Sequence, residues 1–412
     1  MKILLCHNYY RQPGGEDTEY SAEKALLTSF GHQVLEYVRR NDEIPLDGFL
    51  AKISVGLRSI WASDSVGEIR AVLWREKPDV VHFHNTFPLI SPGAYYACYE
   101  AGVPVVQALQ NYRLLCPAAT LHRSGEICKE CLEYGLLQGV KHGCYRGSRS
   151  TTAMVGLMLA FHRWMNTWTE MVDRYIAPTE FVRRKVVQGG IPADKISVKP
   201  NLVYPDPGVR TDKGEYALFV GRLVPEKGVD TLLEAWNFIE NAVPLRIAGD
   251  GPMRAALEAQ KENAGLGNVL FEGQLSREKL RSVMKRAAFL IFPSEWYEPF
   301  GLAIAEAFAC GVPVIVSRLD PLLETVEEGK TGLCFTPREA IELAAKVDWA
   351  WTHSNEMEEM GRAARTRYQT KYSAERNYVE LMHIYHEACH SSRSKIRDQS
   401  KGVPQWAAGE MT

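Results

Sequence analysis

The sequence predicts an α/β protein made of two doubly wound domains, and three observations indicate this fold. Short apolar runs alternate with segments of good helix formers along nearly the whole chain, as in parallel sheets covered by helices. The chain of 412 residues is too long for one hydrophobic core. Residues 199–214 carry three prolines and no periodicity, which is typical of a linker. We therefore expect a first domain over residues 1–200 and a second over 201–373.

The first domain is expected to open with a strand at 2–7, a loop, and a helix at 18–30. Further strands are predicted at 33–38, 80–84, 103–108, 175–177 and 196–198. The first loop carries Gly14 and Gly15, and a backbone without side chains lets a phosphate or sugar approach closely. The full G-x-G-x-x-G pattern is absent, which argues against a standard dinucleotide-binding fold.

Two histidines in the third predicted strand, His82 and His84, share one face because side chains alternate along a strand. They can be satisfied core histidines or part of an acceptor cleft, and the pattern favours the core.

Four cysteines lie close together in an insertion that has no apolar core of its own. Cys116, Cys128, Cys131 and Cys144 fall within 29 residues, and Cys128-x2-Cys131 has the spacing of a zinc knuckle. The alternatives are a structural zinc and four reduced thiols in a surface loop. Four sulfur ligands would leave no open position, so a catalytic metal is not expected.

The first residues contain an apolar run too short for a signal peptide, so the nine cysteines predict a reducing, cytoplasmic setting. The net charge of −2 gives no reason to expect a nucleic-acid partner. Residues 141–200 are different, with ten Lys/Arg against four Asp/Glu, and they include an apolar helix predicted at 154–168 with two tryptophans. This helix fits either peripheral contact with an anionic membrane or a core position with a solvated basic rim.

The second domain repeats the alternation. Strands are predicted at 216–220, 245–248, 269–272, 289–292, 314–316 and 331–335, and helices up to 239, from 253, and at 302–309, 339–351, 357–369 and 374–389. The polar, aperiodic residues from 391 onward are expected to be loose.

Two cations follow the first strand of this domain. Arg222 should lie at the strand's carboxyl end and Lys227 at the start of the next helix, where they can clamp a diphosphate and neutralise the charge on a leaving group. Gly249 follows the next strand at the same edge of the sheet, and Gln274 is placed where it can reach a nucleobase.

The stretch PSEWYEPFGLAIAEAFACGVPVIVS, residues 293–317, is the most informative part of the chain. It places Glu298 in a loop at the carboxyl end of a strand, where ligands bind in open α/β sheets. Phe300, Gly301 and Leu302 lead into a helix whose start is open to a phosphate. Glu306, on that helix, can accept hydrogen bonds from the paired hydroxyls of a sugar.

These motifs resemble glycosyltransferase family 4, whose members are retaining enzymes of GT-B fold with two Rossmann-like domains facing a cleft. The resemblance covers nearly the whole chain through PGG, GRLVPEKG, AGDGP and EWYEPFGLAIAEAFACGVPVI. HFHNTFPLISP, NYRLLCP and CYRGSR further resemble bacterial members that build lipopolysaccharide, capsule or exopolysaccharide.

The resemblance implies roles for these residues. Arg222 and Lys227 would bind the diphosphate of a UDP-, GDP- or dTDP-sugar, Glu306 the ribose, and Glu298 the transferred sugar, while the Gly14–Gly15 loop would close over the phosphates. The chemistry would need no metal. The acceptor would be a glycan or a lipid-linked sugar, and a helix at 374–390 would cross back to the first domain.

One position departs from the family pattern. Where related sequences commonly have histidine before Asn-Tyr-Arg, this chain has Gln110, which hydrogen-bonds but does not titrate near neutral pH. Two other classes remain open: a GT-B-like epimerase or phosphorolytic enzyme, and a non-catalytic assembly protein that uses the Trp-rich helix and the cysteine loop.

Overall fold

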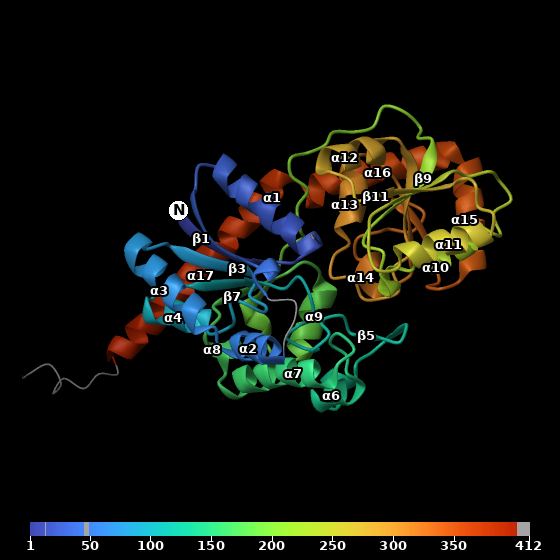
Figure 1. Cartoon of the computed structure of the whole chain (residues 1–412). Coiled ribbons are helices and arrows are strands. Elements are labelled where there is room, and N and C mark those ends of the chain that lie inside the picture. The colour runs from blue at the N-terminus through green and yellow to red at the C-terminus, as the bar shows by residue number, and fades with distance from the viewer. Residues whose placement is uncertain (13, 45–48, 402–412) are drawn as a thin grey trace, which may run out of the picture.

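The computed structural model describes residues 1–12, 14–44 and 49–401 and contains two six-stranded parallel sheets (Figure 1). The first sheet has the order β2-β1-β3-β4-β7-β8 and the second the order β11-β10-β9-β12-β13-β14. In each sheet the chain starts at a central strand and adds strands toward one edge. It then returns to the centre and adds strands toward the other edge. The direction changes between β1 and β3 in one sheet and between β9 and β12 in the other, and ligands bind at such points in open α/β sheets.

The first domain holds one sheet, a small hairpin and nine helices among its described residues. Its strands are β1 Lys2–Tyr9, β2 Gln33–Arg40, β3 Val80–Asn85, β4 Val105–Ala108, β5 His122–Arg123, β6 Glu126–Ile127, β7 Arg174–Ala177 and β8 Ile196–Val198. Its helices are α1 Gly15–Ser29, α2 Phe49–Ile60, α3 Ser63–Glu76, α4 Ala94–Glu100, α5 Glu130–Glu133, α6 Leu137–His142, α7 Arg149–Trp164, α8 Thr167–Glu170 and α9 Glu180–Gln188, with short 3-10 turns at Asn41–Glu43 and Ala193–Lys195.

The second domain and the C-terminal helices follow the linker. The strands are β9 Tyr216–Val220, β10 Leu245–Ala248, β11 Val269–Gly273, β12 Ala287–Phe292, β13 Val314–Ser317 and β14 Gly332–Phe335. The helices are α10 Val229–Ala235, α11 Arg254–Asn263, α12 Arg277–Lys285, α13 Leu302–Ala309, α14 Asp320–Leu323, α15 Ala340–Thr352, α16 Ser354–Lys371 and α17 Ala374–Lys401, with a 3-10 turn at Pro225–Lys227.

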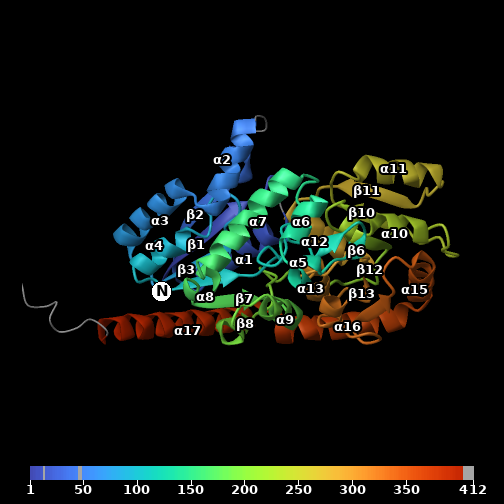
Figure 2. The ribbon, with the colours of Figure 1, turned by 90° about the horizontal axis from the view of Figure 1, so that it is seen from below.

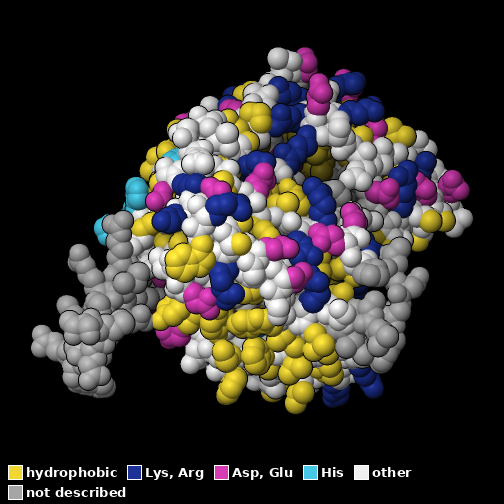
Figure 3. All heavy atoms as spheres, turned by 60° about the vertical axis from the view of Figure 1, so that its left-hand side comes forward, with side chains coloured by type: hydrophobic (Ala, Val, Ile, Leu, Met, Phe, Trp, Pro, Cys, Tyr) yellow, Lys and Arg dark blue, Asp and Glu magenta, His cyan; other side chains and the backbone are white. Residues whose placement is uncertain are grey.

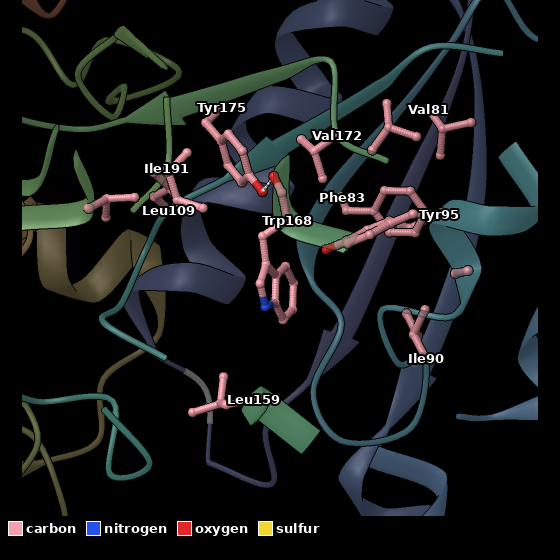
Figure 4. Close-up of a cluster of buried hydrophobic side chains, with 14 of the residues drawn as sticks. Val81, Phe83, Ile90, Tyr95, Leu109, Leu159, Trp168, Val172, Tyr175 and Ile191 are labelled. Atoms are coloured by element: carbon pink, nitrogen blue, oxygen red, sulfur yellow. Dashed lines mark hydrogen bonds between the residues drawn. The ribbon is translucent and has the colours of Figure 1, made fainter. Parts of the chain in front are cut away.

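Each sheet is covered on both faces, which explains why its strands read as continuous apolar runs. Figure 4 shows one face of the first sheet, where Phe83 and Tyr95 pack near Trp168. The buried hydroxyl of Tyr175 donates a hydrogen bond of 2.7 Å to the carbonyl oxygen of Trp168. Helix α7 contributes Leu159 to the same cluster, so this apolar helix packs partly against the core.

The last helix crosses back to the first domain, as the family resemblance implies. It runs along the first sheet, whereas α16, which precedes it, lies against the second domain (Figure 2). Leu381, Ile384 and Tyr385 of α17 pack against Ile3 and Leu5 of β1. The two domains are therefore joined twice, by the linker and by this helix.

Two expectations from the sequence are wrong in detail. The apolar helix predicted at 154–168 starts at Arg149 and ends at Trp164, because Asn166 adopts a left-handed conformation with φ of 54° and a separate helix follows. The segment from 391 was expected to be loose, yet α17 continues to Lys401. Its polar residues include neither glycine nor proline before Gly402, so nothing in this stretch stops the helix. Residues 402–412 lie outside the described residues.

Candidate functional site

The point where the second sheet changes direction brings two loops together. Strands β9 and β12 are neighbours, so the loops that follow them lie at the same carboxyl edge. The backbone N–H of Glu295 donates to the carbonyl of Glu226 at 3.0 Å, and the hydroxyl of Thr231 donates to the Glu295 carboxylate at 3.0 Å. The sequence-predicted residues Lys227 and Glu298 belong to these two loops.

Lys227 and Glu298 form an ion pair at this edge. The Glu298 carboxylate is 5% exposed, and its Oε1 also accepts hydrogen bonds from Ser294 Oγ at 2.8 Å and from Trp296 Nε1 at 2.7 Å. The Lys227 ammonium lies 5.3 Å from the centre of the Phe292 ring. The Lys227 ammonium and the Glu298 carboxylate are therefore fixed in position by the side chains around them, and such preorganised charges suit the binding of a charged ligand. Ser294 and Trp296 were missed by sequence reasoning, although both belong to the same loop.

Arg222, Gly249 and Gln274 follow three adjacent strands at this edge, β9, β10 and β11. The side chains of Arg222 and Gln274 are exposed. Gly249 has a φ of 152°, and a Cβ atom on it would come within 1.8 Å of the Gly221 carbonyl oxygen. Only glycine therefore lets the loops after β9 and β10 lie against each other.

The start of α13 is the third part of the site. Gly301 is its N-cap residue, and Leu302 opens the helix, whose first backbone N–H groups have no partner within the helix. The Phe300 ring is buried and packs edge-to-face on Tyr372 at 5.6 Å. Phe300 can thus offer a ligand its backbone but not its side chain, which restricts the donor-binding role predicted for it.

Glu306 faces a hollow between the two domains. The hollow is bounded by α1, α12, α13 and the linker, through residues Thr18, Ala22, Leu202, Val203, Tyr204, Pro207, Arg277, Leu280, Arg281, Met284, Glu306 and Cys310. Burial raises the pKa of the Glu306 carboxyl to about 7, and Arg277 and Arg281 partly oppose the shift. The Glu306 carboxyl lines this cavity and does not lie on an open surface of the helix, so a ligand in the cavity could contact it.

This raised pKa predicts how stability depends on pH. The folded pKa of about 7 lies above the ordinary glutamate value of 4.5, so the unfolded chain loses the Glu306 proton first as the pH rises. The free energy of unfolding therefore falls progressively as the pH rises from the unfolded pKa to the folded pKa, and the loss is complete above both. Glu306→Gln removes this penalty. We expect the Tm of the variant relative to wild type to rise from about pH 5 to about pH 8. A constant difference across that range would contradict the assignment.

The glycine loop of the first domain lies at the carboxyl end of β1. Gly14 is the N-cap residue of α1, and its N–H donates to the Asp17 carboxylate at 2.9 Å. A Cβ atom on Gly14 or Gly15 would meet no heavy atom within 4 Å, so there is room for a ligand beside the loop. Arg277 of α12 donates to the Thr18 carbonyl at 3.4 Å, which brings the start of α1 against the second domain.

Gln110, the position that departs from the family pattern, pairs with the linker. Its amide and that of Asn201 exchange two hydrogen bonds, of 2.9 and 2.8 Å. Asn201 was missed because the sequence gives no local signal that joins positions 91 residues apart. The pair ties the loop after β4 to the linker next to the hollow that Glu306 lines.

His82 and His84 are buried core residues, the reading that the sequence favoured. Their ring nitrogens lie 2.8 and 3.4 Å from Oε1 of Glu23, and these three residues form the one group among the described residues whose ligand atoms lie within 4.8 Å of one another. Lys199 already neutralises Glu23 at 3.3 Å, and the hydroxyl of Tyr385 in α17 meets His82 at 2.9 Å. We therefore interpret the group as a buried ionic network at the junction of linker and crossover helix.

Two family models match the chain, one in each half. "Glycosyl transferase 4-like domain" matches residues 26–202, and "Glycosyl transferases group 1" matches residues 205–367. The D-rhamnosyltransferase WbpZ of Pseudomonas aeruginosa is 33% identical over 161 residues, which cover 39% of this chain and 42% of WbpZ. A 2-deoxystreptamine glucosyltransferase of Streptomyces kanamyceticus is 26% identical over 348 residues, 80% of this chain and 85% of that enzyme. Several other curated relatives, like WbpZ, are matched over less than half of their length.

Solved structures match over almost the whole chain. Alr3699/HepE of Anabaena, in complex with UDP-glucose, has a TM-score of 0.66 at 18% identity and covers 96% of this chain and 100% of its own. Sucrose-phosphate synthase of Thermosynechococcus elongatus has a TM-score of 0.69 at 18% identity, covering 94% of this chain and 98% of its own. These matches confirm the predicted GT-B fold.

Proposed function

Because the chain belongs to the GT4-type glycosyltransferases, we propose that it moves a sugar from a nucleotide-sugar donor to a glycan or lipid-linked acceptor with retention of the anomeric configuration. One observation carries the proposal: the Lys227–Glu298 pair lies at the switch point between β9 and β12. Arg222 and the open start of α13 follow the same two strands. This arrangement suits an anionic leaving group joined to a sugar.

The diphosphate of the donor would meet Arg222 and Lys227 at the carboxyl edge of the second sheet. Arg222 and Lys227 supply cationic donors, and the first turn of α13 supplies N–H groups, so a diphosphate can be bound without a metal. Glu306 would accept hydrogen bonds from the ribose hydroxyls. HepE, with the same fold, has been crystallised with UDP and with UDP-glucose, which supports a nucleotide-sugar donor.

In the reaction, the bond between the sugar's anomeric carbon and the diphosphate oxygen breaks, and its electron pair goes to that oxygen. Arg222, Lys227 and the helix start stabilise the negative charge that grows there. The acceptor hydroxyl then forms the new bond on the face from which the diphosphate leaves, and its proton passes to the departing phosphate oxygen. Glu298 holds the Lys227 ammonium and would contact the transferred sugar.

The test is a turnover screen with UDP-, GDP- and dTDP-sugars and lipid-linked or oligosaccharide acceptors. We expect one donor to be consumed only when acceptor is present, and proton NMR of the product to show the donor's anomeric configuration. An altered nucleotide sugar released without acceptor would establish an epimerase instead. Absence of nucleotide binding by thermal shift would favour the assembly-protein alternative.

A role in cell-surface polysaccharide synthesis is the proposed setting of this reaction. The loop motifs HFHNTFPLISP and CYRGSR support it, and WbpZ is by name a D-rhamnosyltransferase. Among residues 1–12, 14–44 and 49–401, none of the helices has the length and apolar character needed to span a bilayer.

An exposed apolar patch over α2 and α7 supports peripheral contact with an anionic membrane. The side chains of Leu57, Leu157 and Trp164 are 56%, 53% and 77% exposed. Figure 3 shows hydrophobic side chains gathered along the lower part of the molecule, where α2 and α7 lie in Figure 1, with both basic and acidic side chains around them. Trp168, the other tryptophan of the region, is buried, so only part of the segment fits this role.

The patch predicts a specific loss of membrane binding. Leu157→Ser with Trp164→Ser should lower co-flotation with vesicles rich in anionic lipid by about tenfold at low salt, since both side chains would leave the interface. Leu270→Ser, on an equally exposed leucine of β11, is the matched control and should float like wild type. Equal flotation of the double variant and wild type would reject the membrane surface.

A further inference from the structure

The cysteine-rich insertion, residues 116–144, brings its four cysteines into one neighbourhood. Cys116 and Cys131 are buried, Cys128 and Cys144 are half-buried, and all four are free thiols. The Cys116 sulfur is hydrogen-bonded to Cys131, and Cys144 lies near Cys116 and Cys128. The thiols therefore converge on one side of the insertion.

The backbone around Cys116 is shaped to hold a thiolate. The backbone of Ala118, Ala119 and Leu121 lies around its sulfur, and the Ala119 N–H donates to the Cys116 carbonyl oxygen at 2.9 Å. N–H groups aimed at a cysteine sulfur are stabilising when the sulfur carries a negative charge, as it does when it binds a metal.

The remaining cysteines are anchored by backbone bonds. The N–H of Cys128 donates to the Leu121 carbonyl at 2.8 Å, and that of Cys144 donates to the Gly139 carbonyl at 3.1 Å. Gly139 also packs on Cys131, because a Cβ atom there would lie 3.3 Å from the Cys131 sulfur. The turns that carry the four thiols are thus tied to one another.

Leu121, Leu132 and Leu136 of the insertion pack against the core of the first domain, but the insertion has little regular structure of its own. Its strands β5 and β6 have two residues each, and α5 and α6 have four and six. Elements this short are not stable on their own, and small units without a core are commonly stabilised by a metal.

We propose that Cys116, Cys128, Cys131 and Cys144 bind one zinc ion in a closed tetrahedral site that fixes this insertion against the second domain. Zinc–sulfur bonds of about 2.3 Å would replace the Cys116–Cys131 hydrogen bond, and the thiol protons would pass to solvent. Among the described residues no three of these sulfur atoms lie within 4.8 Å of one another. Binding therefore draws the half-exposed Cys128 and Cys144 inward by rotation about their side-chain bonds.

The segment that the zinc would fix touches the second domain. Between β5 and β6, Ser124 and Gly125 form a two-residue turn with φ values of 51° and 80°. A Cβ atom on Gly125 would lie 1.9 Å from a guanidinium nitrogen of Arg338, so a side chain there would force the guanidinium to move away. Next to it, Glu126 accepts a hydrogen bond of 2.6 Å from Arg338, and Ile127 packs against the core of the second domain.

Arg338 continues the contact to the candidate site. Its Nε donates to Glu295 at 2.8 Å, in the loop that carries Glu298. Cys128 lies two residues beyond Glu126, so a metal at Cys128 would fix a strut that runs from the insertion through Arg338 to this loop. The effect of the strut on catalysis rests on the proposed function, but the metal site and the strut do not.

Metal analysis tests the site. Full-length protein purified without chelator, or stripped and then incubated with Zn²⁺, should hold one zinc per chain by mass spectrometry of the metal. Cys128→Ser and Cys144→Ser should lose it, and Cys389→Ser in α17 should keep it. Cobalt loading should give the visible absorption bands of a tetrahedral thiolate site. Failure of the stripped protein to take up Zn²⁺, or retention of zinc by both variants, would overturn the proposal.

Hydrogen exchange tests the strut without relying on activity. Removing zinc should raise exchange of residues 122–127 and of 293–298 by at least about tenfold. Glu126→Gln should keep one zinc yet raise exchange at 293–298 only. Unchanged exchange in both segments after zinc removal would contradict the strut. If zinc binding and hydrogen exchange both behave as expected but the protein shows no turnover, that result would count against the proposed function and not against the metal site.

Discussion

Lys227→Ala is expected to lower kcat/KM for sugar transfer by about 100-fold or more, because a preorganised cation is removed from the site where charge grows on the leaving diphosphate. The ammonium is paired with Glu298, and the Lys227 side chain is 15% exposed, so it is held in position but is not fully buried. Steady-state kinetics with the donor found in the screen measure the loss. The affinity for the nucleoside diphosphate should fall as well.

The control for this variant must separate chemistry from folding. Without Lys227 the buried Glu298 carboxylate loses its counter-charge, but it keeps the hydrogen bonds from Ser294 and Trp296. We therefore expect a cooperative thermal transition at a lowered Tm. Lys330→Ala, on an exposed lysine of the same domain, should change neither rate nor affinity. Turnover of Lys227→Ala close to wild type would remove this lysine from the mechanism.

Glu306→Ala is expected to weaken nucleotide binding by about 10- to 100-fold, the usual cost of losing hydrogen bonds to a charged group. The carboxylate faces the hollow between α12 and the linker, and its neighbours Arg277 and Arg281 favour its charged form. Because the interaction is made with the ribose before and during reaction, the effect should appear mainly in the donor KM.

Two comparisons make the Glu306 result specific. Glu262→Ala, on an exposed glutamate of α11, should bind nucleotide like wild type. A free sugar-1-phosphate, which lacks the ribose, should inhibit wild type and Glu306→Ala equally. A nucleotide affinity unchanged in Glu306→Ala, measured by calorimetry, would contradict the role assigned to this carboxylate.

The local pattern of the sequence was enough to predict the sheets and the edge where the site lies. In the stretch 293–317 the glycine after the loop and the run of helix formers fixed α13 at its observed bounds. What the pattern could not predict are contacts between distant segments. Lys199 meets Glu23 and Arg338 meets Glu126, and neither pair has a short-range signal.

Local backbone geometry accounts for the wrongly predicted end of the apolar helix. The left-handed Asn166 splits the apolar helix, so Trp164 is exposed while Trp168 is buried, although both belong to one apolar run. Asparagine tolerates this conformation, but periodicity does not reveal where the chain adopts it. Helices α2 and α3 were not assigned from the sequence.

The decisive measurement is a structure of the protein with a bound nucleoside diphosphate. We expect the diphosphate to lie within hydrogen-bond distance of Arg222, Lys227 and the first N–H groups of α13, with the ribose hydroxyls on Glu306. A nucleotide bound elsewhere, or bound here with its phosphates away from Lys227 and α13, would contradict it.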